Sequence, residues 1–505
     1  MEQDFDVVII GSGMGGLCCG AILSKEGYRV CILEKNRQFG GSLQIFSRDK
    51  VVFDTGVHYL GGMEEGQTLH QIFKYLGIIN KLKLHKLDAD GFDRISFKDD
   101  PSIYNHAQGH CNFVEKLCVY FPEERINIQA YMDKVLALCE KFPMYKLSVE
   151  DKNQDFLQFL EQDTFLTLQK VTSNRKLQNV LGGSNPLYAG VAKKTPFYVH
   201  ALVTNSYIES AWKCVGGSSR IATLLCDSIK SYGGTVLNYS EVKKLNMGTD
   251  RIKSVELEDG RKIEGRTFIS NIDLRRTLQM VDQKAFRPAF VNRINSLENT
   301  TSVFIIYLVL KQGLVSYFNH NIYHYESDDV WESIHYSKAT WPESFSVFPQ
   351  FSEKQPEFAE GLIVMAYMNY EEVQQWEGSR NIVPREINSR GQGYEEFKQE
   401  RAELLIDRLE IRLPGIRSAI QSYTCSTPLT FRDYLGTLDG NLYGVAKDYQ
   451  NSMRTYIPVR TKIPNLLLTG QNINLHGILG VSITAILTCS EIMGRDYLVE
   501  KVRQS

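Results

Sequence analysis

The 505-residue sequence predicts an α/β protein in which a Rossmann-like dinucleotide-binding domain, assembled from separate segments, carries an inserted α+β domain. Three observations lead to this prediction. The N-terminus has the pattern of a strand, a glycine turn, a helix and a second strand. A strand, a glycine turn and a helix return near the C-terminus, and the segments between are rich in aromatic residues.

The N-terminal unit begins with an apolar, β-branched run over residues 5–10, which is typical of a strand buried on both faces. Gly11, Gly13 and Gly16 follow in the G-x-G-x-x-G spacing. The first glycine allows a tight turn, the second lets the backbone approach a pyrophosphate, and the third lets the helix pack closely on the strand. This spacing therefore predicts a dinucleotide turn.

A helix over residues 17–26 and a second strand over residues 29–33 complete the unit. The positive N-terminal end of the helix would face phosphate oxygens. Glu34 ends the strand at 34 − 13 = 21 positions beyond Gly13, close to the roughly 20 expected of a carboxylate that binds a ribose hydroxyl. The complete series is far more specific than the glycine pattern alone.

Later segments supply the rest of the expected domain. Gly233 and Gly234 end an amphipathic helix, and Glu258-Asp259-Gly260 has the pattern of a hairpin turn. The strands that we expect around these turns and near the C-terminus cover residues 235–237, 252–257, 261–263, 266–270 and 465–469.

The intervening segments contain expected helices over residues 126–142 and 395–413, an apolar strand over residues 302–310, and a polar loop over residues 377–392. Their richness in aromatic residues sets these segments apart from the dinucleotide-binding segments and indicates a second domain that interrupts the first one twice. We expect the dinucleotide domain to comprise residues 1–75, 206–275 and 421–505, and the inserted domain residues 76–205 and 276–420.

Composition and charge exclude several classes of protein. A net charge of −2 without a Lys/Arg stripe argues against nucleic-acid binding. Ten cysteines without a C-x-x-C pair indicate reduced thiols in a cytoplasmic protein. The apolar run over residues 5–23 follows an acidic leader and is broken by glycines, so we expect neither a signal peptide nor a transmembrane segment. His106 and His110 have no third ligand pattern beside them, so no metal is expected.

Two further features favour a flavin over a nicotinamide dinucleotide. Gly40 and Gly41 form a second glycine pair whose backbone can pass close to a long ligand. After Gly470, a helix starting near Gly480 would point its dipole at the flavin pyrimidine end and stabilise negative charge there. No second fingerprint for a nicotinamide nucleotide is present, so the sequence neither supports nor excludes NAD(P)H as the electron donor.

Five motifs are spread over both ends of the chain: GSGMGG (11–16), LEKNRQFGGS (33–42), FDTGVHYLGG (53–62), STPLTFRDYLG (426–436) and LTGQNINLHGILGV (468–481). In this combination the sequence resembles the carotenoid/retinoid flavin oxidoreductases, the family of phytoene desaturases, carotenoid cis–trans isomerases and retinol saturases. It leans toward the retinol-saturase (all-trans-retinol 13,14-reductase) branch. The resemblance is weaker in the middle of the chain, where the substrate would be selected.

The resemblance implies an amine-oxidase or phytoene-desaturase type of fold and a non-covalent FAD. The chemistry would be hydride transfer at flavin N5 on the carbon–carbon double bonds of an apolar polyene, in saturation, desaturation or isomerisation. By position, the cofactor residues would be Gly11, Gly13, Gly15 and Gly16 at the pyrophosphate, Glu34 at the ribose, Lys35, Gly40, Gly41 and Ser42 along the cofactor, Val242 at the adenine, and Gly470, Gln471, Leu479, Gly480, Val481 and Ser482 at the ribityl and ring end.

His58, Tyr59 and His476 are the candidate proton donors, because they lie in segments expected near the flavin and carry groups suited to proton transfer. The alternative is that the two histidines only hydrogen-bond turns or cofactor oxygens. Six more residues are candidates for apolar walls or simply for core: Met63, Phe73, Tyr75, Trp212, Tyr307 and Tyr367.

An apolar substrate has to arrive from a membrane or a carrier, so peripheral membrane contact is expected without an anchor. Two other functions stay open on the sequence. One is an amine-oxidase-like flavoenzyme, and the other is a non-catalytic lipid or prenyl escort protein of the same fold.

Overall fold

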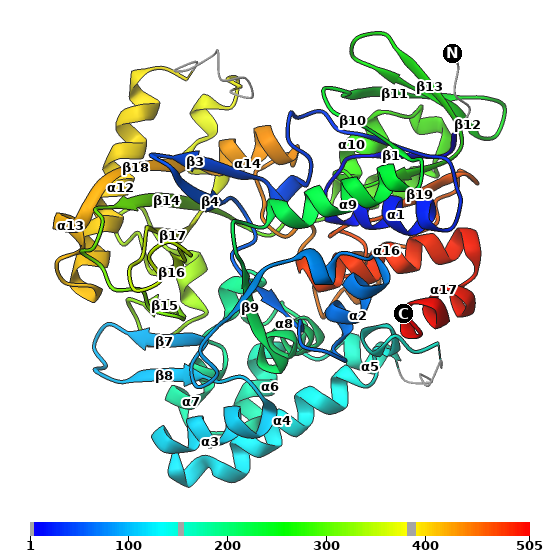
Figure 1. Ribbon diagram of the computed structural model, residues 1–505. Helices are drawn as coiled ribbons and strands as arrows, with labels where there is room; N and C mark the ends of the chain where they lie inside the picture. The colour runs from blue at the N-terminus through cyan, green and yellow to red at the C-terminus, as the bar shows by residue number, and fades with distance from the viewer. Residues whose placement is uncertain (1–4, 150–155, 381–389) are drawn as a thin grey trace.

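Two seven-stranded sheets organise the chain, of which the computed structural model describes residues 5–149, 156–380 and 390–505 (Figure 1). The first sheet has the order β10-β2-β1-β13-β12-β11, with β19 paired to β13. Its strands are β1 (Phe5–Ile10), β2 (Val30–Leu33), β10 (Thr235–Leu237), β11 (Val242–Met247), β12 (Ile252–Leu257), β13 (Lys262–Ser270) and β19 (Leu466–Leu468).

Five strands of this sheet, β10, β2, β1, β13 and β19, run parallel, so their carboxyl ends meet at one edge. The chain leaves this edge at Gly11, Glu34, Asn271 and Thr469. Ligands of open parallel sheets bind outside this edge. The topology therefore brings the N-terminal glycine turn and the C-terminal segment to one place.

Helices pack on the first sheet: α1 (Met14–Lys25), α9 (Ser219–Ser231), α10 (Leu274–Gln279), α11 (Pro288–Asn295), α16 (Gly477–Met493) and α17 (Arg495–Arg503). Val7 and Ile9 of β1 lie in a core shared with α1, α9 and α16. Val8 and Ile10 lie in another core, which includes residues of α10 and α11. As predicted, β1 is buried on both faces, while α1 begins three residues earlier than expected.

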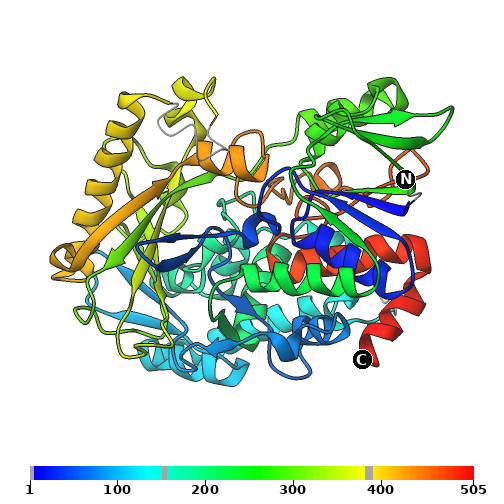
Figure 2. The same cartoon turned by 45° about the horizontal axis from the view of Figure 1, so that its top comes forward.

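The second sheet has the order β18-β14-β17-β16-β15-β7-β8 and stands beside the first (Figure 2). Its strands are β7 (Asp93–Phe97), β8 (Ile103–His106), β14 (Ser302–Leu310), β15 (Asn321–Tyr325), β16 (Ser344–Gln350), β17 (Gly361–Met368) and β18 (Ile420–Ser426). Along β14, Ile305 and Tyr307 lie in one core, whereas Ile306 and Leu308 lie in another. This alternation confirms the apolar strand expected over residues 302–310.

Helices flank both faces of the second sheet, with α3, α4 and α8 on the side of one core and α12 on the side of the other. The bounds are α2 (Thr68–Tyr75), α3 (His110–Tyr120), α4 (Arg125–Cys139), α5 (Phe156–Leu160), α6 (Thr164–Val171), α7 (Arg175–Leu181), α8 (Phe197–Glu209), α12 (Gln392–Arg412), α13 (Ile416–Ala419), α14 (Pro428–Leu435) and α15 (Ser452–Thr455). Within the described ranges, no helix combines the length and the apolar character needed to cross a bilayer.

One expected strand break is wrong. The strands expected over residues 261–263 and 266–270 form the single strand β13. Gly265 lies inside this strand and does not interrupt it. A Cβ at this position would lie 2.7 Å from Val8 Cγ2. A glycine is needed here because β1 and β13 approach closely.

Two other segments pair differently from the expected domain division. The strand β9 (Ala211–Cys214) joins β5 (Leu60–Gly61) and β6 (Leu84–Lys86) in a small sheet of its own. The boundary expected at residue 421 falls inside β18, an edge strand of the second sheet. Residues 381–389 of the expected polar loop lie outside the described residues. A further two-stranded sheet consists of β3 (Ile45–Arg48) and β4 (Val51–Asp54).

Candidate functional site

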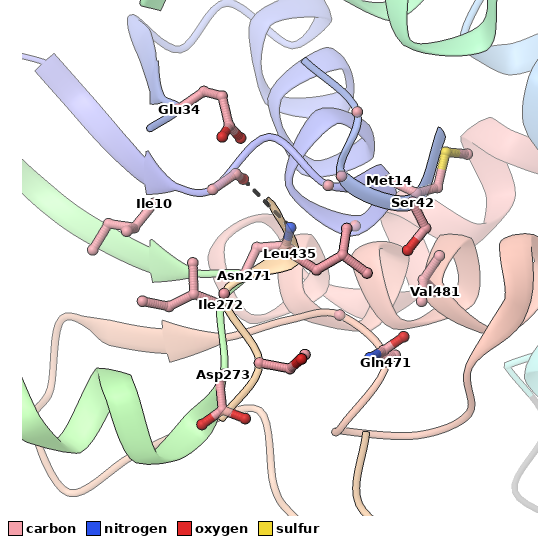
Figure 3. A pocket seen from close by; sticks show the side chains of 18 of the residues that line it. Ile10, Met14, Glu34, Ser42, Asn271, Ile272, Asp273, Leu435, Gln471 and Val481 are labelled. Atoms are coloured by element: carbon pink, nitrogen blue, oxygen red, sulfur yellow. Dashed lines mark hydrogen bonds between the residues drawn. The ribbon is translucent and has the colours of Figure 1, made fainter. Parts of the chain in front are cut away.

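A cleft lies at the carboxyl edge of the first sheet, where the glycine turn, the end of β13 and the C-terminal segment meet (Figure 3). Glu34, Asn271 and Gln471 come from three widely separated segments and border this same hollow. We call it the dinucleotide cleft. Its position is the one expected for a ligand of an open parallel sheet.

The glycine turn leaves no room for side chains. A Cβ on Gly16 would lie 2.2 Å from the carbonyl oxygen of Gly11, and one on Gly15 would lie 2.7 Å from Asn271 Oδ1. Gly11 has a φ of +91°, in the region that favours glycine. Helix α1 starts after Gly13 without a side-chain cap, so the N–H groups of its first turn are free to bind phosphate oxygens.

Glu34 is held rigidly at the end of β2. Its Oε2 accepts hydrogen bonds from the N–H of Ser12 at 3.1 Å and from Ser12 Oγ at 2.6 Å, and its Oε1 accepts from the N–H of Asn36 at 2.8 Å. The side chain is buried but borders the cleft. A carboxylate has lone pairs beyond those three bonds, so Glu34 can still accept from a ribose hydroxyl.

Two cationic side chains border the same part of the cleft. The Nζ of Lys35 donates to the carbonyl oxygen of Asp433 at 2.6 Å, and burial lowers the pKa of this lysine. Arg276 of α10 lines the cleft, and its Nε is buried without a hydrogen-bond partner among the described residues. A buried guanidinium N–H without a partner fits an anionic ligand, because phosphate oxygens would satisfy it.

A second cavity, which we call the inner cavity, adjoins the cleft. Both are bordered by residues of three separate segments, among them Ser42, Val57, Leu435, Tyr443 and Ile478. The inner cavity continues toward the second sheet and includes mostly apolar and aromatic side chains, such as Ile305, Tyr323, Phe348, Met365 and Phe431. It also extends to the start of α16, which has no side-chain cap.

Most of the expected cofactor residues lie together. Gly16 packs against the carbonyl oxygen of Gly11 and does not border the dinucleotide cleft. Leu479 and Gly480 border the inner cavity and not the cleft. Ser482 faces α1, where its Oγ donates to the carbonyl oxygen of Ile478 at 2.7 Å and lies 3.8 Å from Cys18 Sγ. The remaining twelve border the dinucleotide cleft: Gly11, Gly13, Gly15, Glu34, Lys35, Gly40, Gly41, Ser42, Val242, Gly470, Gln471 and Val481.

The three candidate proton donors all border the inner cavity. The His58 ring stacks on Phe348 with centroids 4.5 Å apart, and burial lowers its pKa to about 3. His476 Nε2 lies 3.0 Å from the carbonyl oxygen of Leu187, and burial lowers its pKa to about 4. Both imidazoles are therefore neutral near pH 7. Tyr59 Oη donates to a carboxylate oxygen of Asp93 at 2.9 Å.

Other sequence candidates lie elsewhere. His106 contacts the carbonyl oxygen of Val180, and His110 contacts Asn205 Oδ1, each at 2.9 Å. None of the six candidate wall residues borders the inner cavity; those six are Met63, Phe73, Tyr75, Trp212, Tyr307 and Tyr367. In the part of the chain that the structure describes, no three His, Cys, Asp or Glu side chains group together as metal ligands would.

Sequence reasoning missed two residues that border the cleft, Asn271 and Arg276, and one buried residue behind it, Ser12. Ser12 fixes Glu34, Arg276 supplies a buried cation, and Asn271 stands between the glycine turn and Gly470. Asn271 Nδ2 donates to the carbonyl oxygen of Gly11 at 3.4 Å, the bond drawn dashed in Figure 3. Its place directly after a strand of the parallel sheet was the signal that could have revealed it.

Comparison with known proteins agrees with this geometry. Residues 9–76 match the model of an NAD(P)-binding Rossmann-like domain. The chain is 28% identical to all-trans-retinol 13,14-reductase of Macaca fascicularis, over 98% of this chain and 87% of that protein. It is 24% identical to prolycopene isomerase 1 of an Oncidium hybrid cultivar, over 95% of this chain and 79% of that protein. These similarities support the carotenoid/retinoid family of FAD-dependent oxidoreductases.

The similarity to these relatives over nearly the whole chain confirms the resemblance drawn from the five motifs. A solved structure of putrescine oxidase bound to putrescine superposes with a TM-score of 0.65, covering 97% of this chain and 99% of that one at 12% identity. At that identity the likeness concerns the fold alone. It confirms the predicted amine-oxidase type of fold.

Proposed function

We propose that this protein binds FAD non-covalently in the dinucleotide cleft and acts on carbon–carbon double bonds of an apolar, retinoid- or carotenoid-like polyene. The observation that carries the proposal is the junction of the two cavities at Ser42, Tyr443 and Ile478. A dinucleotide that starts at the glycine turn and follows the cleft would end at the wall of the inner cavity. The names of the reductase and isomerase relatives support a polyene as its occupant.

The residues present fit FAD along the whole cleft. The glycine turn and Arg276 would hold the pyrophosphate, and Glu34 and Val242 would hold the adenosine. Gln471 and the uncapped start of α16 would meet the ribityl chain and the ring. When bound, FAD supplies hydride transfer to or from carbon at its N5 atom.

The chain itself would orient the substrate and exclude water. Ile305, Phe348, Met365 and Phe431 give the inner cavity apolar walls that match a hydrocarbon chain. A dry cavity also protects a reduced flavin from side reactions. Proton transfer falls to Tyr59 and its partners rather than to His58 and His476, whose depressed pKa values keep them neutral.

Purification and anaerobic mixing test the proposal. We expect a yellow protein whose flavin is released on denaturation. The reduced holoenzyme should be reoxidised by all-trans-retinol or a carotenoid and not by the imine product of putrescine. A protein that stays colourless after addition of FAD would refute both flavoenzyme functions and favour a lipid escort protein. Reoxidation by the imine alone would favour an amine oxidase.

Arg276→Met and Arg275→Met form a matched pair for the cofactor site. Arg276 lines the cleft with an unpartnered Nε, whereas its neighbour Arg275 donates to the carbonyl oxygen of Leu297 outside the cleft. We expect Arg276→Met to weaken FAD binding by about tenfold or more, since a charged hydrogen bond contributes about 1.5–3 kcal/mol. Arg275→Met should leave the affinity for FAD unchanged. Equal affinities in the two variants would contradict this placement of the pyrophosphate.

We also infer a cytoplasmic protein that touches membranes only peripherally. All ten cysteines are free thiols, and all except Cys111, Cys214 and Cys425 are buried. Reduced, buried thiols are usual in a reducing compartment, and an apolar substrate has to be taken from a bilayer or a carrier. Co-sedimentation with phosphatidylcholine vesicles, with and without retinol, tests the contact. No co-sedimentation in either case would favour delivery by a carrier.

A further inference from the structure

Three buried side chains form one hydrogen-bonded series at the wall of the inner cavity. Asp93 Oδ2 accepts from Tyr59 Oη at 2.9 Å, and Tyr59 Oη lies 2.8 Å from Tyr323 Oη. The other carboxylate oxygen of Asp93 accepts from Asn321 Nδ2 at 2.8 Å. Asp93 is 0% exposed, Tyr59 5% and Tyr323 1%, and both tyrosines border the inner cavity while Asp93 lies behind them.

We propose that this series is the proton relay of the proposed reaction: Asp93 stores the proton, Tyr59 passes it on, and Tyr323 exchanges it with the substrate carbon. The inference rests on the function proposed above. It gives Tyr59 the role of an intermediate carrier and adds two residues, Asp93 and Tyr323, that the sequence did not point to.

The fold fixes the relay through strand register. β7 and β15 are parallel neighbours in which Asp93 is level with Asn321. Tyr323 is two residues further along β15, so its side chain lies on the same face of the sheet as that of Asn321. Tyr59 reaches this face from the segment before β5. Each member is therefore positioned by a strand or its flank, as a preorganised site requires.

The direction of the hydrogen bonds depends on the charge of Asp93. When Asp93 is ionised, Tyr59 donates to it and Tyr323 donates to Tyr59, because a carboxylate can only accept. When Asp93 is protonated, it can donate to Tyr59, and Tyr59 to Tyr323. The hydroxyl proton of Tyr323 is then no longer committed to Tyr59 and can point into the cavity. One proton on Asp93 thus makes one proton available at Tyr323 Oη.

The surroundings allow Asp93 to change charge near neutral pH. Burial raises the pKa of Asp93 to about 7, although the hydrogen bonds from Asn321 and Tyr59 and the charge of Lys213 lower it. Burial lowers the pKa of Lys213 on β9 to about 7, so the two groups titrate in the same range. A proton store for turnover at neutral pH needs such a value.

The histidines and tyrosines beside the relay stay neutral there. His106 is level with Asp93 on β8, and burial lowers its pKa to about 4. His58 is neutral as described above. Burial raises the pKa of Tyr207 on α8 and of Tyr443, which influence the relay tyrosines, above their usual value. Burial also raises the pKa of Asp54, whose charge acts on Lys213. Asp93 and Lys213 each have a pKa of about 7.

The step balances as follows for saturation of a double bond. One carbon would receive a hydride from the reduced flavin of the proposed function, and the O–H bond of Tyr323 would break as a C–H bond forms at the other carbon. Tyr323 regains a proton from Tyr59, and Tyr59 from Asp93, which is left as a carboxylate. Asp93 takes up a proton from solvent before the next cycle. Desaturation would use the same relay in reverse.

Infrared spectroscopy of the purified protein tests the store without substrate or cofactor. We expect the carbonyl stretch of a protonated carboxylic acid to disappear as the pH rises through about 7, and to be absent in Asp93→Asn. Tyr59→Phe removes a hydrogen bond that lowers the pKa of Asp93, so the disappearance should shift to higher pH. An acid band that titrates unchanged in Asp93→Asn, or one that does not shift in Tyr59→Phe, would overturn the relay.

Rapid-mixing kinetics test delivery. Tyr323→Phe should slow reoxidation of the reduced holoenzyme by its polyene by about 100-fold, the usual size of a proton-transfer contribution, with FAD affinity unchanged. Asp93→Asn should remove the dependence of this rate on pH near neutrality. Tyr325→Phe is the matched control. Tyr325 lies on the same strand as Tyr323, but its Oη donates to the carbonyl oxygen of Gly183 and to Asn185 Oδ1, away from the cavity. A wild-type rate in Tyr323→Phe would overturn the relay.

The two proposals fail in different ways. A wild-type protein that binds no FAD refutes the proposed function. The infrared titration still tests in that case whether Asp93 holds a proton and whether Tyr59 lowers its pKa. A flavoprotein that turns over a polyene equally well as Tyr323→Phe keeps the proposed function and loses the relay.

Discussion

Gly16 lies directly against Gly11: a Cβ on Gly16 would lie 2.2 Å from the Gly11 carbonyl oxygen. Real β-carbons do not approach backbone oxygen so closely, so Gly16→Ala has to move helix α1 away from β1. The helix start would then no longer face the dinucleotide cleft correctly.

We expect Gly16→Ala to lower the free energy of unfolding by about 1–3 kcal/mol, the usual cost of overpacking, and to abolish FAD binding. Thermal unfolding and flavin titration measure the two effects. Gly393→Ala is the control, since a Cβ there meets no atom within 4 Å. A Gly16→Ala protein with wild-type affinity for FAD would show that the cleft does not bind the cofactor through this turn.

Glu34→Gln should selectively weaken FAD binding. The carboxylate of Glu34 accepts three hydrogen bonds from Ser12 and Asn36, and a glutamine would place an NH₂ group against one set of these donors. We expect the Kd for FAD to rise by about 10- to 100-fold, as for the loss of a charged hydrogen bond. Equilibrium titration measures it, with the exposed Glu258→Gln as control. An unchanged Kd would show that Glu34 does not bind the ribose of FAD.

Local signals in the sequence predicted the dinucleotide unit well. The G-x-G-x-x-G turn and Glu34 needed only residues close together in the chain, and the structure places them at one sheet edge. The two strands expected over residues 261–263 and 266–270 are one strand, and Gly265 between them packs closely against Val8. Local pattern does not distinguish a turn from a close approach.

The deeper part of the site could not be predicted, because long-range pairing assembles it. Asp93 and Tyr59 are 34 positions apart, and Tyr59 and Tyr323 are 264 apart. Nothing near Tyr323 in the sequence marks it as different from Tyr325, which bonds elsewhere. Register between β7 and β15 sets Asp93 level with Asn321 and so brings Tyr323, two residues further along, to the pair of Asp93 and Tyr59; register is a property of the folded sheet.

Lys213 should make the protein more stable at alkaline pH. Its Nζ donates to the carbonyl oxygen of Pro349 at 2.7 Å, and burial lowers its pKa to about 7 from the ordinary lysine value of 10.5. Between these values the unfolded chain binds more protons at this lysine than the folded chain, so the free energy of unfolding rises with pH. We expect a rise of a few kcal/mol, at about 1.4 kcal/mol per pH unit.

Chemical denaturation at a series of pH values measures this rise, and Lys213→Met should lack it because methionine does not titrate. Lys230→Met, a change at an exposed lysine of helix α9, is the control and should keep it. Parallel pH profiles for wild type and Lys213→Met would show that Lys213 stays charged in the folded protein.

Leu479 and Val481 should separate substrate binding from cofactor binding. They are two residues apart in α16, but Leu479 borders the inner cavity and Val481 borders the dinucleotide cleft. Leu479→Ala removes three apolar carbons from the substrate wall, so we expect the KM for the polyene to rise by up to about 50-fold, given about 0.8 kcal/mol for each buried CH₂. The Kd for FAD should stay unchanged.

Val481→Ala should do the reverse and weaken FAD binding with little effect on KM. Steady-state kinetics and flavin titration of both variants decide the matter. If Leu479→Ala weakens FAD binding instead, the cofactor extends beyond the dinucleotide cleft into the inner cavity.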